Sequence, residues 1–428
     1  MNKDIPVASG PISAFVRLPG SKSITNRALI CAALADGEST IRNASDSDDT
    51  ALLANGLNQL GILVRKKGGD LVVEGKGGRV YAPRFPVPVG NAGTTLRFLM
   101  GVATLADGTV VFEGSGRMSE RPIQPFLEAL RDLGVRCDAV DFAGRYAVQG
   151  GTLHGGPVHI RSDISSQFLS SITMVGPYAK TDIRLHPVGA GVSTPYMSMT
   201  MEVMKKFRCD VKNESDGSFV VAAGQRYRPG DFEVEPDFSG AAFFCAAASI
   251  TSGEVTFSPV SSESMQGDFG VFSLLGEIAG AVHHEGGRLT FSSDGAGSYD
   301  GVDVDLRAMP DVVPALTSML LFARTPSRIR GIGHLRFKES DRLETISSEL
   351  RNIGAKIRLT DDGMEIEPAP LAGGLLNPHD DHRLAMSFAI IGLKVPGISI
   401  GKPECVSKSF PAFWTELGKL MVRTETSR

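Results

Sequence analysis

Six stretches of the chain are apolar at nearly every position, and each is long enough to form a helix buried on all sides. Each follows a short segment rich in Gly, Ser, Asn or Asp and gives way to a turn and a β-like segment. The pattern predicts buried helices over residues 23–35, 94–106, 167–179, 239–250, 312–323 and 383–393.

These stretches recur at a regular interval. The Gly turns at Gly37, Gly108, Gly253 and Gly397 are 71, 145 and 144 residues apart, and the last two intervals are double steps. One repeat is therefore about 72 residues long, which exceeds the roughly 20–50 residues of solenoid repeats. This period indicates a small α/β subdomain used six times.

Each repeat also contains a second, amphipathic helix and short strands. The clearest amphipathic helices are expected over residues 125–133, 196–207 and 343–353, and strands over 109–113, 146–149, 183–187 and 219–222. The repeat is thus close to βαβαββ. Because 428 residues exceed the roughly 250–300 at which single cores stop growing, two domains of three repeats each are expected.

Composition restricts the classes of partner. The net charge of −4 favours neither nucleic acid nor a membrane surface, and no segment approaches the roughly 18 apolar residues of a membrane span. We see no signal-peptide pattern at the N-terminus and expect a cytoplasmic protein. Its cysteines are scattered without a CxxC pair: Cys31, Cys137, Cys209, Cys245 and Cys405. We interpret them as reduced thiols in the core, and a nucleophilic cysteine is the less favoured alternative.

The residues that precede the buried helices are small and polar, as in Gly20-Ser21-Lys22-Ser23 and Ser165-Ser166-Gln167. Helix capping alone explains such residues, and this interpretation stays open for any single site. However, the free N–H groups and the dipole of a helix N-terminus attract anions. Lys22, Arg27 and Arg383 lie within one turn of these starts, so we expect anion binding there.

Further cations lie in the loops before the amphipathic helices. For any one of these cations, the simplest interpretation is a charged side chain on the solvated surface. If the repeats are equivalent, however, these loops emerge at equivalent ends and their cations converge with Lys22 and Arg27, which predicts a receptor for polyanions. The loop cations are Arg121, Lys338, Arg342 and Lys408, and Arg383 would join them from the start of its buried helix.

Two other motifs carry less weight. Gly20-Ser21-Lys22-Ser23 lacks the GxxxxGK[ST] spacing of a phosphate-binding loop, so nucleotide hydrolysis is not expected. His379-Asp380-Asp381-His382 resembles a metal cluster but offers no evident third ligand. We expect neither a metal nor a cofactor.

Taken together, the motifs closely resemble those of the 5-enolpyruvylshikimate-3-phosphate synthase family. The segments, in family order, are LPGSKSITNRAL (18–29), GNAGTTLRF (90–98), RMSERPI (117–123), SSQF (165–168), STPY (193–196), PD (310–311), FKESDRL (337–343), DDHRLAM (380–386) and SKSFP (407–411). They cover essentially the whole chain. The resemblance implies an α/β (α+β) fold, a two-domain inverse α/β barrel of six βαβαββ units, three per domain, with the active site in the interdomain cleft.

The resemblance also implies the domain boundaries. Residues 19–235 would form an N-terminal globe that mainly binds shikimate 3-phosphate. Residues 1–18 with 236–428 would form a C-terminal globe that carries most of the cations for phosphoenolpyruvate.

The implied reaction moves the enolpyruvyl group of phosphoenolpyruvate to the 5-hydroxyl of shikimate 3-phosphate and releases phosphate, by addition and elimination through a tetrahedral intermediate. The residue chemistry is consistent with it, because two phosphorylated acids repel each other unless cations surround them. One proton must also leave the hydroxyl and another reach the methylene carbon, and carboxylates do both. Asp311 and Glu339 are the candidates, with Lys22 as a third catalytic residue.

Carried over position by position, the family's pattern assigns the remaining contacts. Shikimate 3-phosphate would contact Lys22, Ser23, Arg27, Ser165, Ser166, Gln167, Ser193, Tyr196, Asp311, His334 and Lys338. Phosphoenolpyruvate would contact Lys22, Asn91, Gly93, Arg121, Gln167, Arg342, Arg383 and Lys408.

Two positions depart from many relatives. His334 stands where they carry Asn, which puts one substrate contact in doubt and suggests a pH dependence near neutrality. Phe98 stands where they carry Pro. Gly93 matches the members of this family that glyphosate inhibits. We therefore expect glyphosate to compete with phosphoenolpyruvate and the substitution Gly93→Ala to weaken this inhibition.

Two alternatives remain. The sister enolpyruvyl transferase acting on UDP-N-acetylglucosamine shares the fold, but its members usually carry a reactive Cys in the loop that here spans residues 117–122 and has none. A non-catalytic phosphate-binding or RNA-end module would need neither Asp311 nor Glu339. The expected partners are therefore the substrates phosphoenolpyruvate and shikimate 3-phosphate and the inhibitor glyphosate. We expect the protein to be a monomer.

Overall fold

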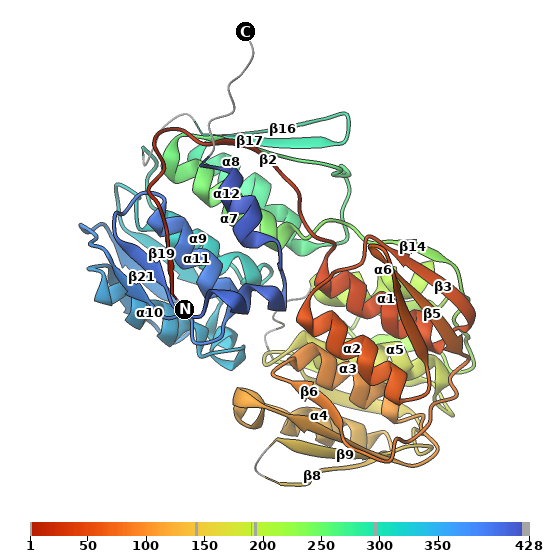
Figure 1. Ribbon diagram of the computed structural model, residues 1–428. Coiled ribbons are helices and arrows are strands. Elements are labelled where there is room, and N and C mark those ends of the chain that lie inside the picture. The colour runs from red at the N-terminus through yellow and green to blue at the C-terminus, as the bar shows by residue number, and fades with distance from the viewer. Residues whose placement is uncertain (1, 142–143, 190, 192–194, 294–297, 422–428) are drawn as a thin grey trace. The chain divides into compact units, whose positions relative to one another are not determined.

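The computed structural model describes residues 2–141, 144–189, 191, 195–293 and 298–421. The chain divides into two compact units, one formed by Gly20–Glu235 and the other by Met1–Pro19 with Pro236–Arg428. We call them the N-terminal and C-terminal units (Figure 1). None of the helices in the described ranges has the length and apolar character needed to cross a membrane.

Three buried helices form the centre of the N-terminal unit: α1 (Lys22–Leu34), α3 (Gly93–Ala103) and α5 (Ser166–Val175). They pack against one another. The pattern of apolar positions predicted all three, with starts correct to within one residue. Helix α5 ends earlier than predicted because the chain tightens into a 3-10 turn at Gly176–Tyr178, where Pro177 lacks the N–H of a regular helix.

Three four-stranded sheets cover these helices. In each, the first two strands are parallel and the last two form an antiparallel hairpin. The strand orders are β14 (Asp231–Glu233), β3 (Asp36–Arg42), β5 (Asp70–Lys76), β4 (Leu63–Lys67); β6 (Val87–Gly90), β7 (Thr109–Gly114), β9 (Arg145–Gln149), β8 (Arg136–Ala139); and β10 (Gly156–Arg161), β11 (Ile183–Val188), β13 (Phe219–Val221), β12 (Val211–Asn213).

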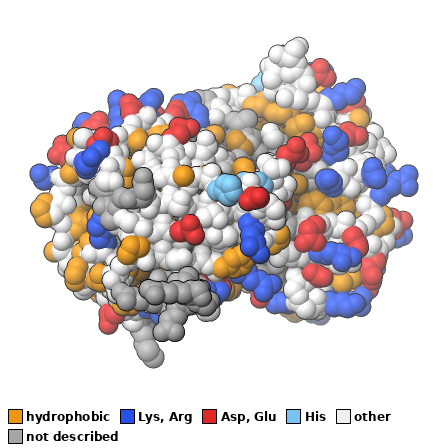
Figure 2. All heavy atoms as spheres, turned by 90° about the horizontal axis from the view of Figure 1, so that it is seen from above, with side chains coloured by type: hydrophobic (Ala, Val, Ile, Leu, Met, Phe, Trp, Pro, Cys, Tyr) orange, Lys and Arg blue, Asp and Glu red, His pale blue; other side chains and the backbone are white. Residues whose placement is uncertain are grey.

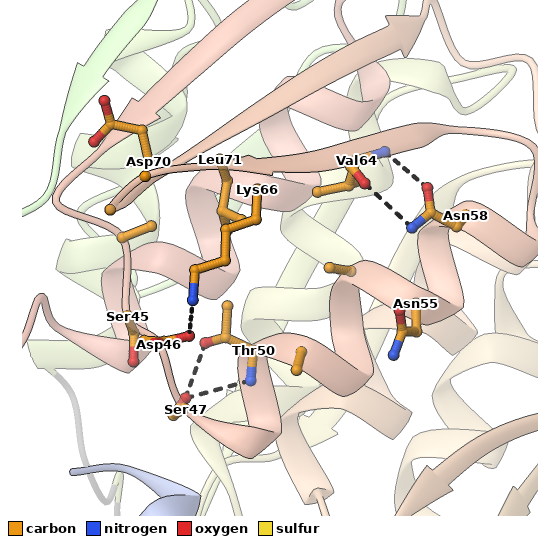
Figure 3. A pocket seen from close by; sticks show the side chains of 15 residues that line it. Ser45, Asp46, Ser47, Thr50, Asn55, Asn58, Val64, Lys66, Asp70 and Leu71 are labelled. Carbon is orange, nitrogen blue, oxygen red and sulfur yellow. Dashed lines mark hydrogen bonds and ion pairs between the residues drawn. The ribbon is translucent and has the colours of Figure 1, made fainter. Parts of the chain in front are cut away.

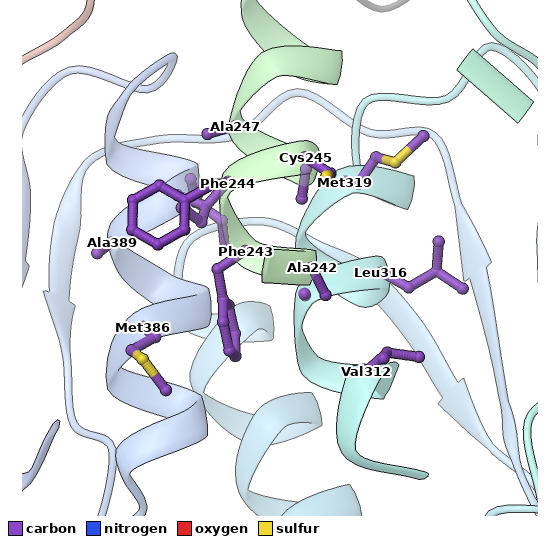
Figure 4. Packing of buried hydrophobic residues seen from close by; sticks show 14 of the residues in the cluster. Ala242, Phe243, Phe244, Cys245, Ala247, Val312, Leu316, Met319, Met386 and Ala389 are labelled. Carbon is purple, nitrogen blue, oxygen red and sulfur yellow. The ribbon is translucent and has the colours of Figure 1, made fainter. Parts of the chain in front are cut away.

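The C-terminal unit repeats this plan around α7 (Phe238–Thr251), α9 (Val313–Leu320) and α11 (His382–Gly392). Figure 4 shows Phe244 of α7 pointing toward α11, near Ala389, and Phe243 pointing between α11 and α9. Helix α9 is shorter than predicted, because the 3-10 turn η4 (Pro310–Val312) includes its predicted first residue and the helix ends at Leu320, three residues early. The apolar character of all three helices thus reflects burial on every side.

The sheets of the C-terminal unit include strands from the N-terminus. Strand β2 (Ser13–Val16), red in Figure 1, pairs in parallel with β15 (Glu254–Phe257), followed by β17 (Arg288–Ser292) and β16 (Ala281–Glu285). The fifth repeat has the order β18 (Asp303–Asp305), β19 (Ser327–Arg330), β21 (Met364–Glu367), β20 (Lys356–Leu359).

The sixth repeat departs from the predicted βαβαββ pattern. Its sheet has three strands, β22 (Gly374–Leu376), β23 (Ile398–Ile400) and the N-terminal β1 (Lys3–Asp4). Strand β1 pairs antiparallel with β23, in the position that a hairpin strand occupies in the other repeats. The N-terminus therefore completes a sheet that the C-terminus leaves short.

A second helix of each repeat lies on the outside. The amphipathic pattern predicted α4 (Gln124–Asp132), α6 (Pro195–Lys206) and α10 (Arg342–Asn352) to within one residue at each end. Helices α2 (Asp48–Gln59), α8 (Val271–Ala279) and α12 (Phe413–Lys419) complete the set.

Candidate functional site

Charged side chains on the molecular surface are mixed in sign. Figure 2 shows Lys and Arg interspersed with Asp and Glu over the face in view, as a net charge of −4 leads one to expect. The unusual charges are buried instead, in one cluster in each unit. The two clusters are described separately.

In the C-terminal unit, Asp311 holds two arginines from different helices. Arg383 donates from Nη2 to the Asp311 carboxylate over 2.8 Å and from Nη1 to its backbone carbonyl over 3.3 Å. Arg342 donates from Nη1 to the same carboxylate over 3.4 Å. The turn before α9, the start of α10 and the start of α11 thus meet at one carboxylate.

Arg342 is the centre of this cluster. Its Nη2 lies 2.8 Å from a Glu339 carboxylate oxygen, and its Nε lies 2.9 Å from Asp381. Asp381 also accepts from the backbone N–H of Arg383, which caps α11. Because Arg342 and Asp381 are essentially inaccessible to solvent, these ion pairs hold the guanidinium in one orientation.

The electrostatics follow from this geometry. Burial opposes ionisation of Asp311, but Arg383, Lys338 and Arg342 outweigh it, so the pKa of Asp311 lies well below its usual value and the group is a carboxylate. Burial opposes the charge of Arg342 as well, yet Asp381, Glu339 and Asp311 raise its pKa. Both groups are therefore charged before any ligand arrives.

His334 is buried beside this cluster, in the 3-10 turn η5 (Gly333–Phe337). Neither ring nitrogen has a hydrogen-bond partner among the described residues. Burial, followed by the charge of Lys338, lowers the pKa of His334 to about 3. The expectation of a titration near neutrality is therefore wrong for the ligand-free protein, in which the imidazole is neutral.

The other predicted residues of this unit lie on the same loops. Lys338 is half-buried and follows η5, close enough to Asp311 and His334 to shift the pKa of each. Lys408 is also half-buried and ends η6 (Pro403–Lys408).

In the N-terminal unit, Lys22 begins α1 and is paired with an aspartate. Its Nζ lies 2.9 Å from Asp49, and both side chains are largely buried. Asp49 is in the first turn of α2, and its backbone carbonyl accepts from the hydroxyl of Thr95 on α3. Three helices therefore fix the position of Lys22.

Arg27 lies one turn further along α1 and has no carboxylate partner among the described residues. Its Nε donates to Thr200 over 2.8 Å, and its Nη1 donates to the carbonyl of Ser23 over 2.9 Å. The guanidinium lies against the rings of Phe98 and Tyr196, at 5.4 and 5.7 Å from their centres. Burial lowers its pKa to about 10, so Arg27 remains cationic at neutral pH.

Gly93 begins α3 between two arginines. A Cβ added there would lie 2.4 Å from Nη1 of Arg97 and 2.5 Å from Nη2 of Arg121, closer than real Cβ contacts. Arg121 donates to the carbonyl of Asn91 over 3.2 Å. Only glycine therefore fits here with both guanidinium groups in place.

The start of α5 carries the remaining predicted residues. Ser165 caps the helix by accepting from the N–H of Gln167, and Ser166 is buried at its first position. The Gln167 amide accepts from Arg97 over 2.9 Å and donates to Thr94 over 2.9 Å. Gln167 is thus joined to the residues around Gly93. The prediction for Ser193 lies outside the described residues.

Sequence reasoning missed several residues that support these side chains. Arg97 and Asp381 lie in the quoted motifs and Asp49 lies outside them, and nothing in their local sequence shows what they contact. Asp381 and Arg342 are 39 residues apart, and Asp49 and Lys22 are 27 apart. The only available signal was that Asp49 and Asp381 stand at helix starts, where capping already explains an aspartate.

The chain is similar to known proteins over nearly its whole length. The family model described as EPSP synthase (3-phosphoshikimate 1-carboxyvinyltransferase) matches residues 7–417. Proteins named 3-phosphoshikimate 1-carboxyvinyltransferase from Methanospirillum hungatei and Syntrophobacter fumaroxidans are 38% and 40% identical to the chain. The first match covers 96% of both chains, and the second covers 98% of this chain and 100% of the relative.

Solved structures share the fold. An EPSP synthase from Acinetobacter baumannii matches with a TM-score of 0.78 at 25% identity, over 98% of both chains. The enolpyruvyl transferase NikO from Streptomyces tendae has the same TM-score at 16% identity, over 98% of this chain and 97% of its own, so it supports the fold alone. The family model and the curated relatives, which extend over nearly the whole chain, show that this protein is a member of the EPSP synthase family.

Proposed function

We propose that this chain transfers the enolpyruvyl group of phosphoenolpyruvate to the 5-hydroxyl of shikimate 3-phosphate and releases phosphate, through a tetrahedral intermediate. The observation that carries the proposal is the buried cluster in which Arg342 and Arg383 hold Asp311 and Glu339. Two carboxylates in fixed positions beside guanidinium groups provide both proton transfer and anion binding.

Asp311 is the proposed base for the 5-hydroxyl. In the ligand-free protein its low pKa makes it a weak base. When anionic substrates engage Arg342 and Arg383, added negative charge raises the pKa of Asp311 and improves its ability to accept a proton. Glu339 is the proposed group that delivers the proton to the methylene carbon. Substrate binding thereby activates the base.

The cations are proposed to divide between the two substrates. Lys22, Arg121, Arg342, Arg383 and Lys408 would bind phosphoenolpyruvate with Asn91, Gly93 and Gln167. Shikimate 3-phosphate would contact Arg27, which lacks a carboxylate partner among the described residues, together with Ser23, Ser165, Ser166, Tyr196, His334 and Lys338. The neutral His334 ring suits a hydroxyl or phosphate oxygen, because either nitrogen can carry the donated proton. Ser193 stays part of the proposal through family resemblance.

Residues from both units are needed for each substrate, so we propose that the substrates lie between the units. Every contact can come from a single chain, which supports action as a monomer. The five free cysteines are consistent with the reducing cytoplasm. We also propose that glyphosate competes with phosphoenolpyruvate, because Gly93 leaves the Arg121 guanidinium unobstructed.

The test is to mix the protein with phosphoenolpyruvate and one acceptor at a time and to measure released phosphate. Release with shikimate 3-phosphate and not with UDP-N-acetylglucosamine supports the proposal. Release with the amino sugar alone would support the sister transferase. Absence of release with either acceptor would contradict both and support a binding module.

A further inference from the structure

A cavity of about 270 Å³ lies in the N-terminal unit, apart from the residues proposed to bind substrate. It is bounded by α2 on one side and by the hairpin of β4 and β5 on the other (Figure 3). Its walls combine polar residues with apolar ones that are mostly small, namely Ala44, Ala51, Ala54, Val64 and Leu71. The proposed reaction gives this cavity no role.

Comparison between repeats explains why the cavity exists. Asn58 of α2 bonds to the backbone of Val64, and six residues also separate Arg131 of α4 from its backbone partner Cys137. This equivalence aligns position 54 with 127. The hairpin pairing aligns position 71 with 146. The second repeat carries the larger, buried Leu127 and Tyr146 at the positions where the first has Ala54 and Leu71.

Among the polar lining residues, Ser47 and Thr50 bond to each other and Asn58 bonds to the backbone of Val64. The hydroxyl of Ser45 is buried and has no hydrogen-bond partner among the described residues, although it lines the cavity. At the rim, Lys66 reaches toward Asp46 and pairs with it over 2.6 Å, as Figure 3 shows. Both members of this pair are more than half exposed, so exchanging one partner for a ligand group costs little. Asp70 adds a second carboxylate to the lining.

We propose that this cavity binds a small zwitterionic α-amino acid with an apolar, ring-sized side chain. An apolar cavity of roughly 150 Å³ holds benzene, so 270 Å³ accommodates a ring and a short polar end. The ligand carboxylate would pair with Lys66 and its ammonium with Asp46, while the ring lies against Ala54 and Leu71. A multiply charged phosphate is disfavoured, because the lining has one cation, Lys66, and Asp46 already pairs with it.

The position of the cavity gives the ligand a route to the proposed active site. Thr50 lines the cavity, and its neighbour Asp49 pairs with Lys22. A ligand that shifts the first turn of α2 therefore shifts the partner of Lys22. We expect occupancy to change the KM for phosphoenolpyruvate at least about twofold, and this kinetic part rests on the proposed function.

Calorimetric titration with L-phenylalanine tests the site directly and needs no turnover. The predicted result is saturable binding that weakens at least about tenfold, or 1.4 kcal/mol, when the probe is L-alanine, 3-phenylpropanoate or 2-phenylethylamine. These probes remove the ring, the ammonium and the carboxylate in turn. Failure of L-phenylalanine to bind at about 10 mM, or equal binding of 3-phenylpropanoate or 2-phenylethylamine, would overturn the proposal.

Two variants locate the binding. Ala54→Leu places the residue of the second repeat in the cavity and should abolish binding, and Lys66→Gln should weaken it. Lys67→Gln is the matched control, because it removes the same charge from the next residue, which does not line the cavity. Unchanged binding in Ala54→Leu would place the ligand elsewhere and refute the site. Saturable binding without a change in the KM for phosphoenolpyruvate would refute only the coupling to Lys22. Absence of turnover by the unmodified protein with phosphoenolpyruvate and shikimate 3-phosphate would instead count against the proposed function.

Discussion

At the scale of single residues, the chemistry of the C-terminal cluster depends on Arg342. This side chain bonds to Asp311, Glu339 and Asp381 at once, and its burial removes the water that would otherwise weaken each pair. Glu339 is therefore held with one carboxylate oxygen toward a guanidinium. Such a group is oriented before the substrates bind, as proton transfer requires.

Replacing Glu339 by Gln should lower kcat at least about 100-fold, the usual scale for a general acid–base, while substrate binding is retained. The amide keeps the size of the side chain and still accepts from Arg342, but it cannot exchange a proton. Steady-state kinetics and equilibrium binding check this. Glu344→Gln, at an exposed position of α10, serves as control. Near-normal turnover of Glu339→Gln would remove Glu339 from its role.

Replacing Gly93 by Ala should raise the inhibition constant of glyphosate by about tenfold or more and raise the KM for phosphoenolpyruvate. The added methyl would lie within 2.5 Å of both Arg97 and Arg121 and must displace their guanidinium groups. Gly418→Ala is the matched control, since its added methyl meets open space. Inhibition assays with varied phosphoenolpyruvate decide the matter, and equal inhibition of Gly93→Ala and the parent would contradict the placement of the inhibitor.

His334 makes a prediction about stability and pH. Its pKa is about 3 in the folded protein and about 6.5 in the unfolded chain, so the unfolded state binds more protons between these values. Stability therefore falls as pH drops from about 6.5 toward 3. His334→Asn removes this contribution and should lose less stability over that range. Denaturant unfolding at pH 7 and pH 4.5 measures the difference, and equal losses in both proteins would show that the imidazole is not buried as described.

At the scale of elements, the starts of the buried helices place the candidate residues. Lys22 begins α1, Gly93 begins α3, and Arg383 is the second residue of α11. The central helices also orient these residues from the side. Phe98 of α3 and Tyr196 of α6 lie against the Arg27 guanidinium of α1. The side chain at position 98 thus acts on a residue of another helix.

Phe98→Leu should raise the KM for shikimate 3-phosphate by about 2- to 30-fold, the range that corresponds to losing a cation–π contact of about 0.5–2 kcal/mol. The effect on kcat should be smaller, because Arg27 is proposed to bind shikimate 3-phosphate and takes no part in proton transfer. Phe112→Leu, at another fully buried position, controls for lost packing. An equal change in KM for both variants would show that Phe98 contributes only to the core.

At the scale of the whole molecule, the period of about 72 residues was enough to predict six repeats, two domains and the central helices, because burial on all sides leaves a plain apolar pattern. The three-stranded sixth sheet was not predictable, since strand β1 pairs with a segment almost 400 residues away.

The residues of the candidate site also fall into a group that the sequence predicted and a group that it did not. Lys22, Arg342 and Arg383 stand in motifs that the resemblance identified, whereas their partners Asp49 and Asp381 are evident only after folding brings distant helix starts together. The low pKa of His334 in the ligand-free protein follows from its burial, which cannot be read from its position in a loop.

The central claim is that cations from both units surround one pair of phosphorylated acids. A crystal structure of the protein with shikimate 3-phosphate and glyphosate, which stands in for phosphoenolpyruvate, tests it most directly. We predict that Lys22 and Arg121 of the N-terminal unit and Arg342 and Arg383 of the C-terminal unit contact the same glyphosate molecule. Ligands bound wholly within one unit, with these four side chains directed to bulk solvent, would contradict the account.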